Sequence, residues 1–188
     1  MRQKEGKKIR KSYIEQMDIQ ENIVNKVAQS GLVTVDPATL YPAGERVIYD
    51  IKDNLYMGLI LREKDFREFV KNHDWAQYAG KNVGITCSED AIVPAWAYML
   101  IANRLAPYAR EVVFGNREAL ETVLFERAMA SFDAEQYRDQ RIVIKGCGEI
   151  DVPVSAYVEL TKKLSPVAKS IMFGEPCSTV PIYKRKDP

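Results

Sequence analysis

The sequence predicts an α/β fold: a three-layer α/β/α domain with a mostly parallel sheet and an antiparallel hairpin at one edge. Two observations carry this prediction. Short β-branched runs alternate along the chain with amphipathic stretches of helical period. Hydrophobic residues make up 46% of the 188 residues, which is enough for a sizeable core, and this length suits one domain.

The first part of the chain is basic. Residues 1–11 hold six Lys or Arg and one Glu, whereas the whole chain has a formal net charge of +1. We expect residues 1–18 to form a solvated, disordered tail, with contact to a nucleic acid or an acidic partner as the alternative. We expect residues 19–188 to form a single α/β domain. Its first helix is predicted over residues 19–30, because apolar side chains fall on one stripe and Gly31 ends it.

A hairpin is expected next. After an extended segment over residues 32–35, residues 45–51 alternate apolar and polar side chains, and residues 55–61 form a continuous apolar run. Both patterns predict strands. Because Asp53 and Asn54 between them predict a turn, we expect the two strands to pair antiparallel at one edge of the sheet.

A regular alternation of strands and helices follows. Strands with short connecting helices are typical of parallel pairing through right-handed crossovers. The predicted helices cover residues 64–72, 92–108, 117–130 and 155–169, the predicted strands cover 82–86, 111–114, 141–144 and 170–173, and residues 179–185 add an edge strand.

Composition excludes several classes of protein. The near balance of charge argues against a dedicated nucleic-acid binder. The longest apolar run, residues 91–102, is shorter than the roughly 20 residues that span a bilayer, and the basic start is not followed by the apolar segment of a signal peptide. Three cysteines, an odd number, without an export signal favour reduced thiols and a cytoplasmic protein.

Each cysteine follows a predicted strand. Cys87 comes after NVGIT, Cys147 after RIVIKG and Cys177 after SIMFGEP. Carboxyl ends of parallel strands meet at one sheet edge, where open α/β sheets bind their ligands. We therefore expect at least two thiols to share a site, with Cys87 close to the N-terminus of the next helix, where the helix dipole favours a thiolate. The alternative is that the three cysteines are small apolar core residues.

The single histidine, His73, lies in the connection between a predicted helix and the strand that precedes Cys87. Such a connection runs along the opposite, amino-terminal edge of a parallel sheet, so we expect His73 to stay apart from the cysteines. If the connection wraps around, His73 and three cysteines would form a Cys₃His set, which is a usual structural zinc complement. No C-x₂-C pair supports this zinc reading.

Several segments resemble one protein family. TCSEDAIVPAWAYMLIA, the preceding HDW, IKGCGE, VPVSAYVELT and MFGEPCSTVPIYKR are similar to the domain-of-unknown-function 2480 family of bacterial proteins. The resemblance runs from about Glu21 to Arg185. It implies a small cytoplasmic bacterial protein, similar to proteins encoded near sulfur-mobilising iron–sulfur assembly genes. No established activity is carried over by this resemblance, but its motifs contain all three cysteines and His73.

Three functions follow as hypotheses. The first is an accessory protein that binds zinc or iron through Cys87, Cys147 and Cys177, with His73, a carboxylate or water as a fourth ligand. Its partner would be a protein that handles metal or iron–sulfur clusters, and a homo-oligomer stays open. The second is an enzyme with a nucleophilic thiol, Cys87 or Cys147. The third is an interaction scaffold in which the cysteines are structural.

Overall fold

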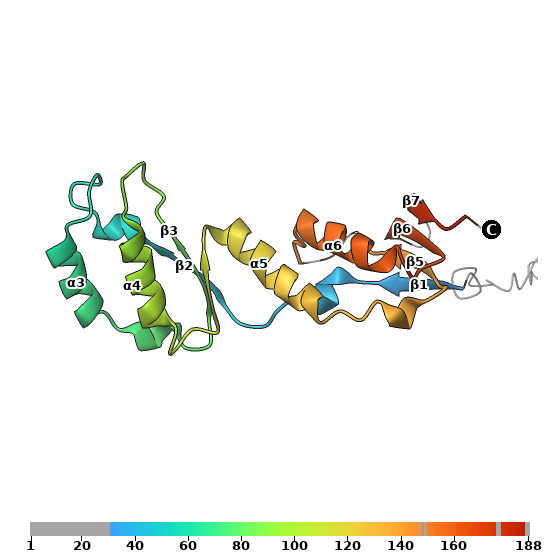
Figure 1. Ribbon diagram of the computed structural model, residues 1–188, viewed down its shortest axis with the longest axis horizontal. Coiled ribbons are helices and arrows are strands. Elements are labelled where there is room, and N and C mark those ends of the chain that lie inside the picture. Colours follow the sequence, from blue (N-terminus) through green and yellow to red (C-terminus); the bar gives the residue numbers. More distant parts are fainter. Residues whose placement is uncertain (1–30, 147, 149, 176–177, 187–188) are drawn as a thin grey trace, which may run out of the picture. The chain divides into compact units, whose positions relative to one another are not determined.

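Strands and helices alternate through the part of the chain that the structure, a computed structural model, describes: residues 31–146, 148, 150–175 and 178–186 (Figure 1). The predicted α/β class is confirmed. Residues from Leu32 onward group as one unit by their contacts. The helix predicted over residues 19–30 and the predicted tail boundary at residue 18 lie outside the described residues, and so do Cys147 and Cys177.

The strands of the described residues divide between two sheets instead of the single sheet that was expected. The first sheet has the order β2-β3-β4 and is parallel throughout. Each crossover in it carries one α-helix, which is the usual connection between parallel strands. Its elements are β2 (Arg46–Asp50), α3 (Glu63–Asn72), β3 (Asn82–Thr86), α4 (Ala95–Leu105) and β4 (Glu111–Phe114), followed by α5 (Arg117–Ala130).

Both faces of the first sheet are covered, so the three-layer arrangement holds there. Helices α3 and α4 lie on one face of the sheet (Figure 1). There, Tyr49 and Ile85 of the strands pack with Phe66 of α3 and Ile101 of α4. The other face packs against Leu120 and Leu124 of α5 in a separate cluster. Central β3 is buried along Asn82–Ile85 because it has neighbours on every side.

The second sheet has the order β1-β5-β6-β7. Strands β1 (Leu32–Val35), β5 (Arg141–Ile144) and β6 (Ser170–Glu175) are parallel, and β7 (Ser178–Lys184) is antiparallel at the edge. The helix α6 (Val154–Leu164) crosses from β5 to β6 and buries Leu160 and Leu164 against Ile142 and Ile171. Met129 from the end of α5 joins the same core.

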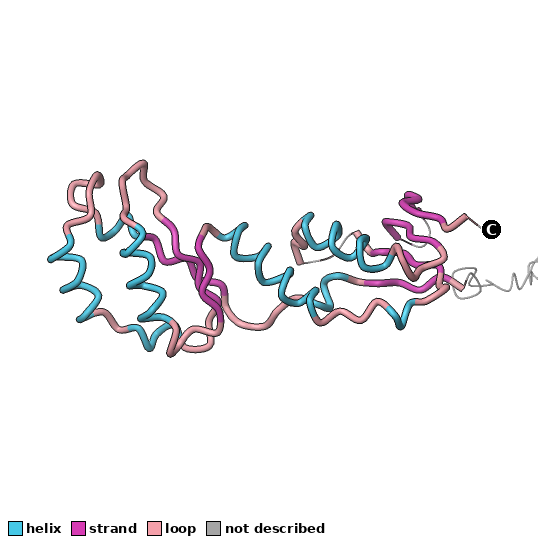
Figure 2. The backbone as a smooth tube through the Cα atoms, viewed as in Figure 1, coloured by secondary structure: helices cyan, strands magenta, loops and turns pink. Residues whose placement is uncertain are grey.

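The antiparallel edge pair is β6–β7, and the hairpin expected over residues 45–61 is wrong. Strand β2 pairs parallel with β3, and a short 3₁₀ helix, Ile51–Asn54, follows β2 in place of the expected turn. Residues 55–61 run as a loop (Figure 2), with isolated bridges from Ile60 to Tyr56 and to Ile92. Further 3₁₀ helices cover Pro37–Leu40, Trp75–Tyr78 and Glu135–Tyr137.

Candidate functional site

The carboxyl ends of β2 and β3 are fixed together by Asp50. Its Oδ1 accepts from the backbone N–H of Lys52 at 3.0 Å and from that of Ser88 at 3.1 Å. Partial burial raises the pKa of Asp50, but the hydrogen bonds from Ser88 and Lys52 outweigh it, so the pKa lies below its usual value. A charged Asp50 thus holds the loop that carries Cys87.

Cys87 lies directly after β3 and is half-buried against the core of the first sheet. Its thiol points to the backbone carbonyl of Glu89, with 3.6 Å between Sγ and O. Burial raises the pKa of the neighbouring Tyr98 phenol, and the charges of Cys87 and Asp50 add to this shift. The site therefore combines a thiol, a phenol and a carboxylate, but it lacks the imidazole that usually activates a cysteine nucleophile.

The helix that follows Cys87 starts later than expected. It begins at Ala95, after Pro94, instead of at residue 92, so the segment Ser88–Pro94 lies between the thiol and the first turn in the chain. Tyr98 of that first turn interacts with Cys87. The favouring of a thiolate by the dipole of α4 stays a prediction.

His73 caps the C-terminus of α3 and joins an aromatic cluster. Its ring centroid lies 4.5 Å from that of Trp75 and 5.0 Å from that of Phe69. Its Nε2 lies 3.2 Å from the Gln77 amide nitrogen and 3.3 Å from the Tyr78 hydroxyl. The Gln77 amide nitrogen also donates to the Asp74 carbonyl. An amide nitrogen can only donate, so Nε2 of His73 is the acceptor in this contact and the ring is neutral.

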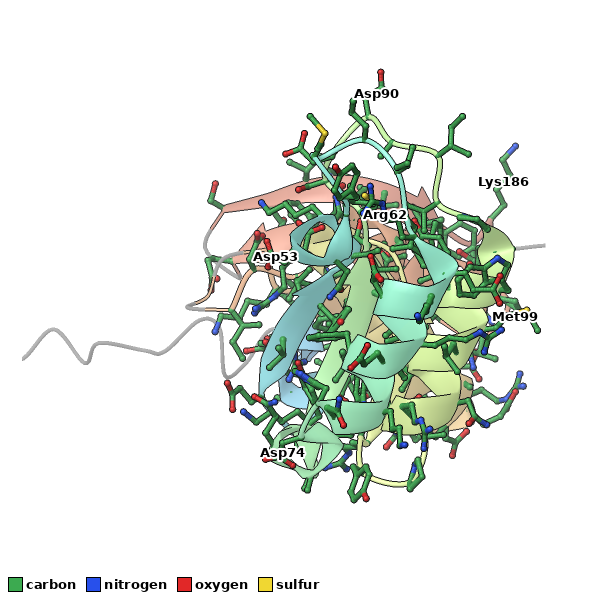
Figure 3. The ribbon with its side chains drawn as sticks, turned by 90° about the vertical axis from the view of Figure 1, so that its left-hand side faces the viewer. Asp53, Arg62, Asp74, Asp90, Met99 and Lys186 are labelled. Carbon is green, nitrogen blue, oxygen red and sulfur yellow. The ribbon has the colours of Figure 1, made fainter. Side chains whose placement is uncertain are left out.

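With respect to Cys87, the placement of His73 agrees with the layout expected from the sequence. Asp74, its neighbour in the chain, lies at the opposite end of Figure 3 from Asp90, which belongs to the loop after Cys87. The ring bonds of His73 go to residues that precede β3, whereas Cys87 follows β3.

The expectation that all three cysteines follow strands of one sheet is wrong. Cys87 follows β3 of the first sheet, whereas β5 and β6, which precede Cys147 and Cys177, belong to the second. Within the described residues, no group of three or more His, Cys, Asp or Glu side chains could hold a metal ion. Cys147 and Cys177 lie outside those residues, so their assignment as ligands stays a prediction.

A set of exposed apolar side chains lies on the loops beyond β2 and β3. We call it the apolar loop surface and define it as Tyr56, Met57, Leu59, Ile60 and Ile92. These side chains are 42%, 76%, 63%, 52% and 87% exposed. The Ile60–Ile92 bridge joins the two loops through their backbones, so the five exposed side chains lie on two neighbouring segments of the chain.

The backbone of the loop over residues 55–61 is strained at Met57, which has the most exposed side chain of that loop. Met57 has a φ of 52° and Gly58 a φ of 70° in the tight turn that the Tyr56–Ile60 bridge closes. Glycine adopts this region freely, but a methionine there costs about 1 kcal/mol. An asparagine or glycine would relieve the strain. The chain instead keeps a large apolar side chain in a strained, exposed position, which is typical of a functional contact.

The rim of the apolar loop surface is acidic. Residues 50–62 and 87–94 contain four acids and two bases. One of the bases, Lys52, pairs with Asp50 at 3.6 Å, and the other, Arg62, lies over the ring of Tyr56 at 3.1 Å from its centroid. Glu89 and Asp90 are exposed and precede Ile92 in the chain, and Asp90 projects outward from its loop in Figure 3.

The sequence did not predict this surface, because a continuous apolar run is typical of a buried strand. One signal could have found it. Gly58 interrupts the run LYMGLIL, and an isolated glycine within a strand pattern indicates a turn or a bulge. Once residues 57 and 58 turn the chain, the run cannot pair along its length, and its side chains stay at the surface.

Comparison with known proteins identifies the family of this chain. The family model described as "Protein of unknown function (DUF2480)" matches residues 21–185. The chain belongs to the DUF2480 family. The match covers both sheets and the apolar loop surface, so these features lie within the family region of this DUF2480 protein. No curated protein and no solved structure matches the chain.

Across the described residues, no helix of the DUF2480 protein combines the length and the apolar character that crossing a bilayer requires.

Proposed function

We propose that this DUF2480 protein is a binding module that recognises a partner protein through the apolar loop surface. One observation carries the proposal: five large apolar side chains, on two loops joined by a backbone bridge, are 42% to 87% exposed. Contiguous exposed apolar side chains with a polar rim are typical of interaction sites. This corresponds to the scaffold hypothesis, now with a defined surface.

The charges of the rim favour a protein over a bilayer. An anionic lipid surface attracts clusters of basic residues, whereas Glu89 and Asp90 flank the most exposed side chain, Ile92. The expected partner has an apolar groove that is bordered by Lys or Arg, because complementary potentials steer association.

The same charges argue against a second copy of the chain. A two-fold interface places the same patch on both subunits, so a surface with an acidic rim would face a second surface with the same excess of negative charge. Like charges that face each other across an interface are unfavourable. The proposed partner is therefore a different protein.

Photocrosslinking in cells of the native host would test the proposal. A benzophenone amino acid at Met57, which is 76% exposed, is expected to give one discrete adduct. The matched control is the same amino acid at Val154, which is 77% exposed but lies on α6. Mass spectrometry of the adduct would identify the partner and the residues joined.

A second experiment removes apolar side chains from the apolar loop surface. In the Met57 crosslinking background, Leu59→Ser with Ile92→Ser should lower adduct yield by about tenfold, because exposed apolar anchors dominate such interfaces. Circular dichroism should show an unchanged fold, since both side chains are more than half exposed. The absence of any adduct from position 57, or the same adduct from position 154, would overturn the proposal.

We propose metal binding through Cys147 and Cys177 as a second function. It is supported by topology: β5 and β6, the strands that precede these cysteines, are parallel neighbours in register from Arg141–Ser170 to Ile144–Phe173. Chain segments that leave such neighbours start from the same sheet edge. Zinc and iron are the ions that thiolates favour.

Elemental analysis of the wild type and of three cysteine variants would test this second function. Protein purified without added metal should carry about half an equivalent or more of zinc or iron by elemental analysis. Cys147→Ser and Cys177→Ser should each remove it. Cys87→Ser is the matched control and should keep the metal, because Cys87 follows a strand of the other sheet. Metal-free wild-type protein, or equal loss in all three variants, would exclude this site.

A further inference from the structure

The second sheet carries an apolar groove that the proposed function does not use. Its floor is Ile144 and Phe173 of the sheet, one wall is Tyr157, Val158 and Lys162 of α6, and the other wall is Ile182 of β7. The groove has a volume of about 320 Å³. We call it the α6–β7 groove. Its volume lies at the small end of the range of about 300–1,000 Å³ that is typical of small-molecule sites.

The groove exists because α6 covers only part of the sheet. Leu160 and Leu164 of α6 are fully buried, whereas Val158 on its flank is 53% exposed. Phe173 pairs with Ile144 and so points to the same face as that buried side chain, yet it is 37% exposed. Ile182, at the β-bulge of β7, is 51% exposed. Three apolar side chains thus face a space that no described helix fills.

The aromatic floor is held in place. The rings of Phe173 and Tyr157 meet edge to face, with centroids 5.5 Å apart at 83°. Gly146 makes room for this arrangement, because a Cβ atom there would lie 2.3 Å from Cζ of Phe173. The groove is therefore a formed feature and does not need to open before it accepts a ligand.

The groove is not explained as a site where another β-strand pairs with the edge strand β7. Pro181 lies in the middle of β7 and has no N–H to donate, and the β-bulge lies beside it. Proline and bulges are the usual devices that protect an edge strand from pairing. The groove is left to receive side chains or a small molecule.

One charged side chain lines the groove. Lys162 lines it, and its Nζ lies 2.6 Å from Oε1 of Glu159. The lysine side chain is 66% exposed, and an exposed ion pair of this kind contributes little to stability. The ammonium can therefore turn to a ligand anion at low cost, whereas the rest of the lining favours an apolar body.

We propose that the α6–β7 groove binds a small amphiphilic anion. Its aromatic or acyl body would lie on Ile144 and Phe173 against Val158, and its carboxylate or sulfonate would lie beside Lys162. This inference does not rest on the proposed partner surface, which lies on loops of the first sheet.

Fluorescence titration with 8-anilinonaphthalene-1-sulfonate, with decanoate as competitor, would test this proposal. We expect saturable binding that decanoate displaces. Ile182→Asp places a carboxylate on the wall and should weaken binding by about tenfold or more, which corresponds to about 1.4 kcal/mol. Because Ile182 is half exposed, the variant should keep its circular dichroism spectrum and unfolding midpoint.

The head group is tested separately. Lys162→Gln should weaken binding of the sulfonate several-fold, whereas Lys71→Gln, an exposed lysine on α3, should leave it unchanged. The neutral probe N-phenyl-1-naphthylamine should bind equally to the wild type and to Lys162→Gln. Equal loss of both probes in Lys162→Gln would show that the lysine shapes the groove and does not bind the anion.

Three results would overturn the proposal. The first is the absence of saturable binding. The second is binding that Leu59→Ser removes and Ile182→Asp keeps, which would place the probe on the apolar loop surface. The third is a dimer in analytical ultracentrifugation that Ile182→Asp converts to a monomer, which would show that a second copy covers the groove.

Discussion

Arg46 at the start of β2 and Glu121 on α5 form an ion pair that is largely shielded from solvent. Nε of Arg46 lies 3.1 Å from Oε1 of Glu121, and the two side chains are 4% and 14% exposed. The guanidinium also donates to the carbonyls of Pro42 and Gly44, each at 2.6 Å, and lies over the ring of Tyr41. This single side chain thus joins β2, the preceding loop and α5.

Removing the Glu121 carboxylate should therefore destabilise the folded protein. Glu121→Ala leaves a buried guanidinium without its anion, and we expect the free energy of unfolding to fall by about 3 kcal/mol. Glu126→Ala, at an exposed position on the same helix, is the control and should change it by less than about 0.5 kcal/mol. Urea denaturation measures both variants. A change in Glu121→Ala no larger than that of the control would contradict this account.

Gly115 should not tolerate a side chain. Its φ is +132°, and a Cβ atom there would lie 2.5 Å from Cβ of Ala119 in the first turn of α5. Because both the backbone and a helix would have to move, we expect Gly115→Ala to lower the free energy of unfolding by about 2–3 kcal/mol. Gly148→Ala meets nothing within 4 Å and should be nearly neutral. Thermal denaturation of the two variants compares them directly.

The two faces of α6 should respond differently to the same change. Leu160 is fully buried in the core of the second sheet, whereas Val158 is 53% exposed. We expect Leu160→Ala to cost about 2–5 kcal/mol through lost burial and a cavity. Val158→Ala should cost less than about 0.5 kcal/mol. Similar losses in urea denaturation would mean that the exposed flank of α6 is covered in solution.

His73 should make stability depend on pH in a known direction. Burial lowers its pKa, and the charge of Asp74 opposes that shift only in part. The unfolded chain then binds a proton before the folded chain does, so stability falls as the pH drops below the ordinary histidine value of about 6.5. The fall levels off below the folded pKa, where both states carry the proton.

The single histidine makes this measurement simple. One imidazole resonance should titrate by NMR in the folded protein, at a pH below that of the urea-unfolded chain. His73→Asn should lose the part of the stability change between pH 7.5 and 5.5 that the wild type owes to this residue. A folded titration at or above the unfolded one would reverse the predicted sign.

The sequence by itself determined the local elements of this DUF2480 protein. The predicted helix 117–130 and the strands 82–86, 111–114 and 141–144 have the observed bounds, because short β-branched runs and amphipathic stripes set the local choice. The family membership and the edge strand that became β7 were also predicted. The helix predicted to start at residue 92 begins at Ala95, because Pro94 disfavours a helix in the residue before it.

Only the tertiary structure decided how these elements combine. Strand β1 pairs with β5 and β2 with β3, pairings that follow from long-range packing and leave no local pattern. For the same reason, the cysteines that seemed to share one sheet edge follow strands of two sheets. The run LYMGLIL carries the same apolar letters as a buried strand, and its turn at Met57 and Gly58 alone puts those side chains on the surface. Apolar character predicts that a side chain can be buried, but only the position of its neighbours decides whether it is.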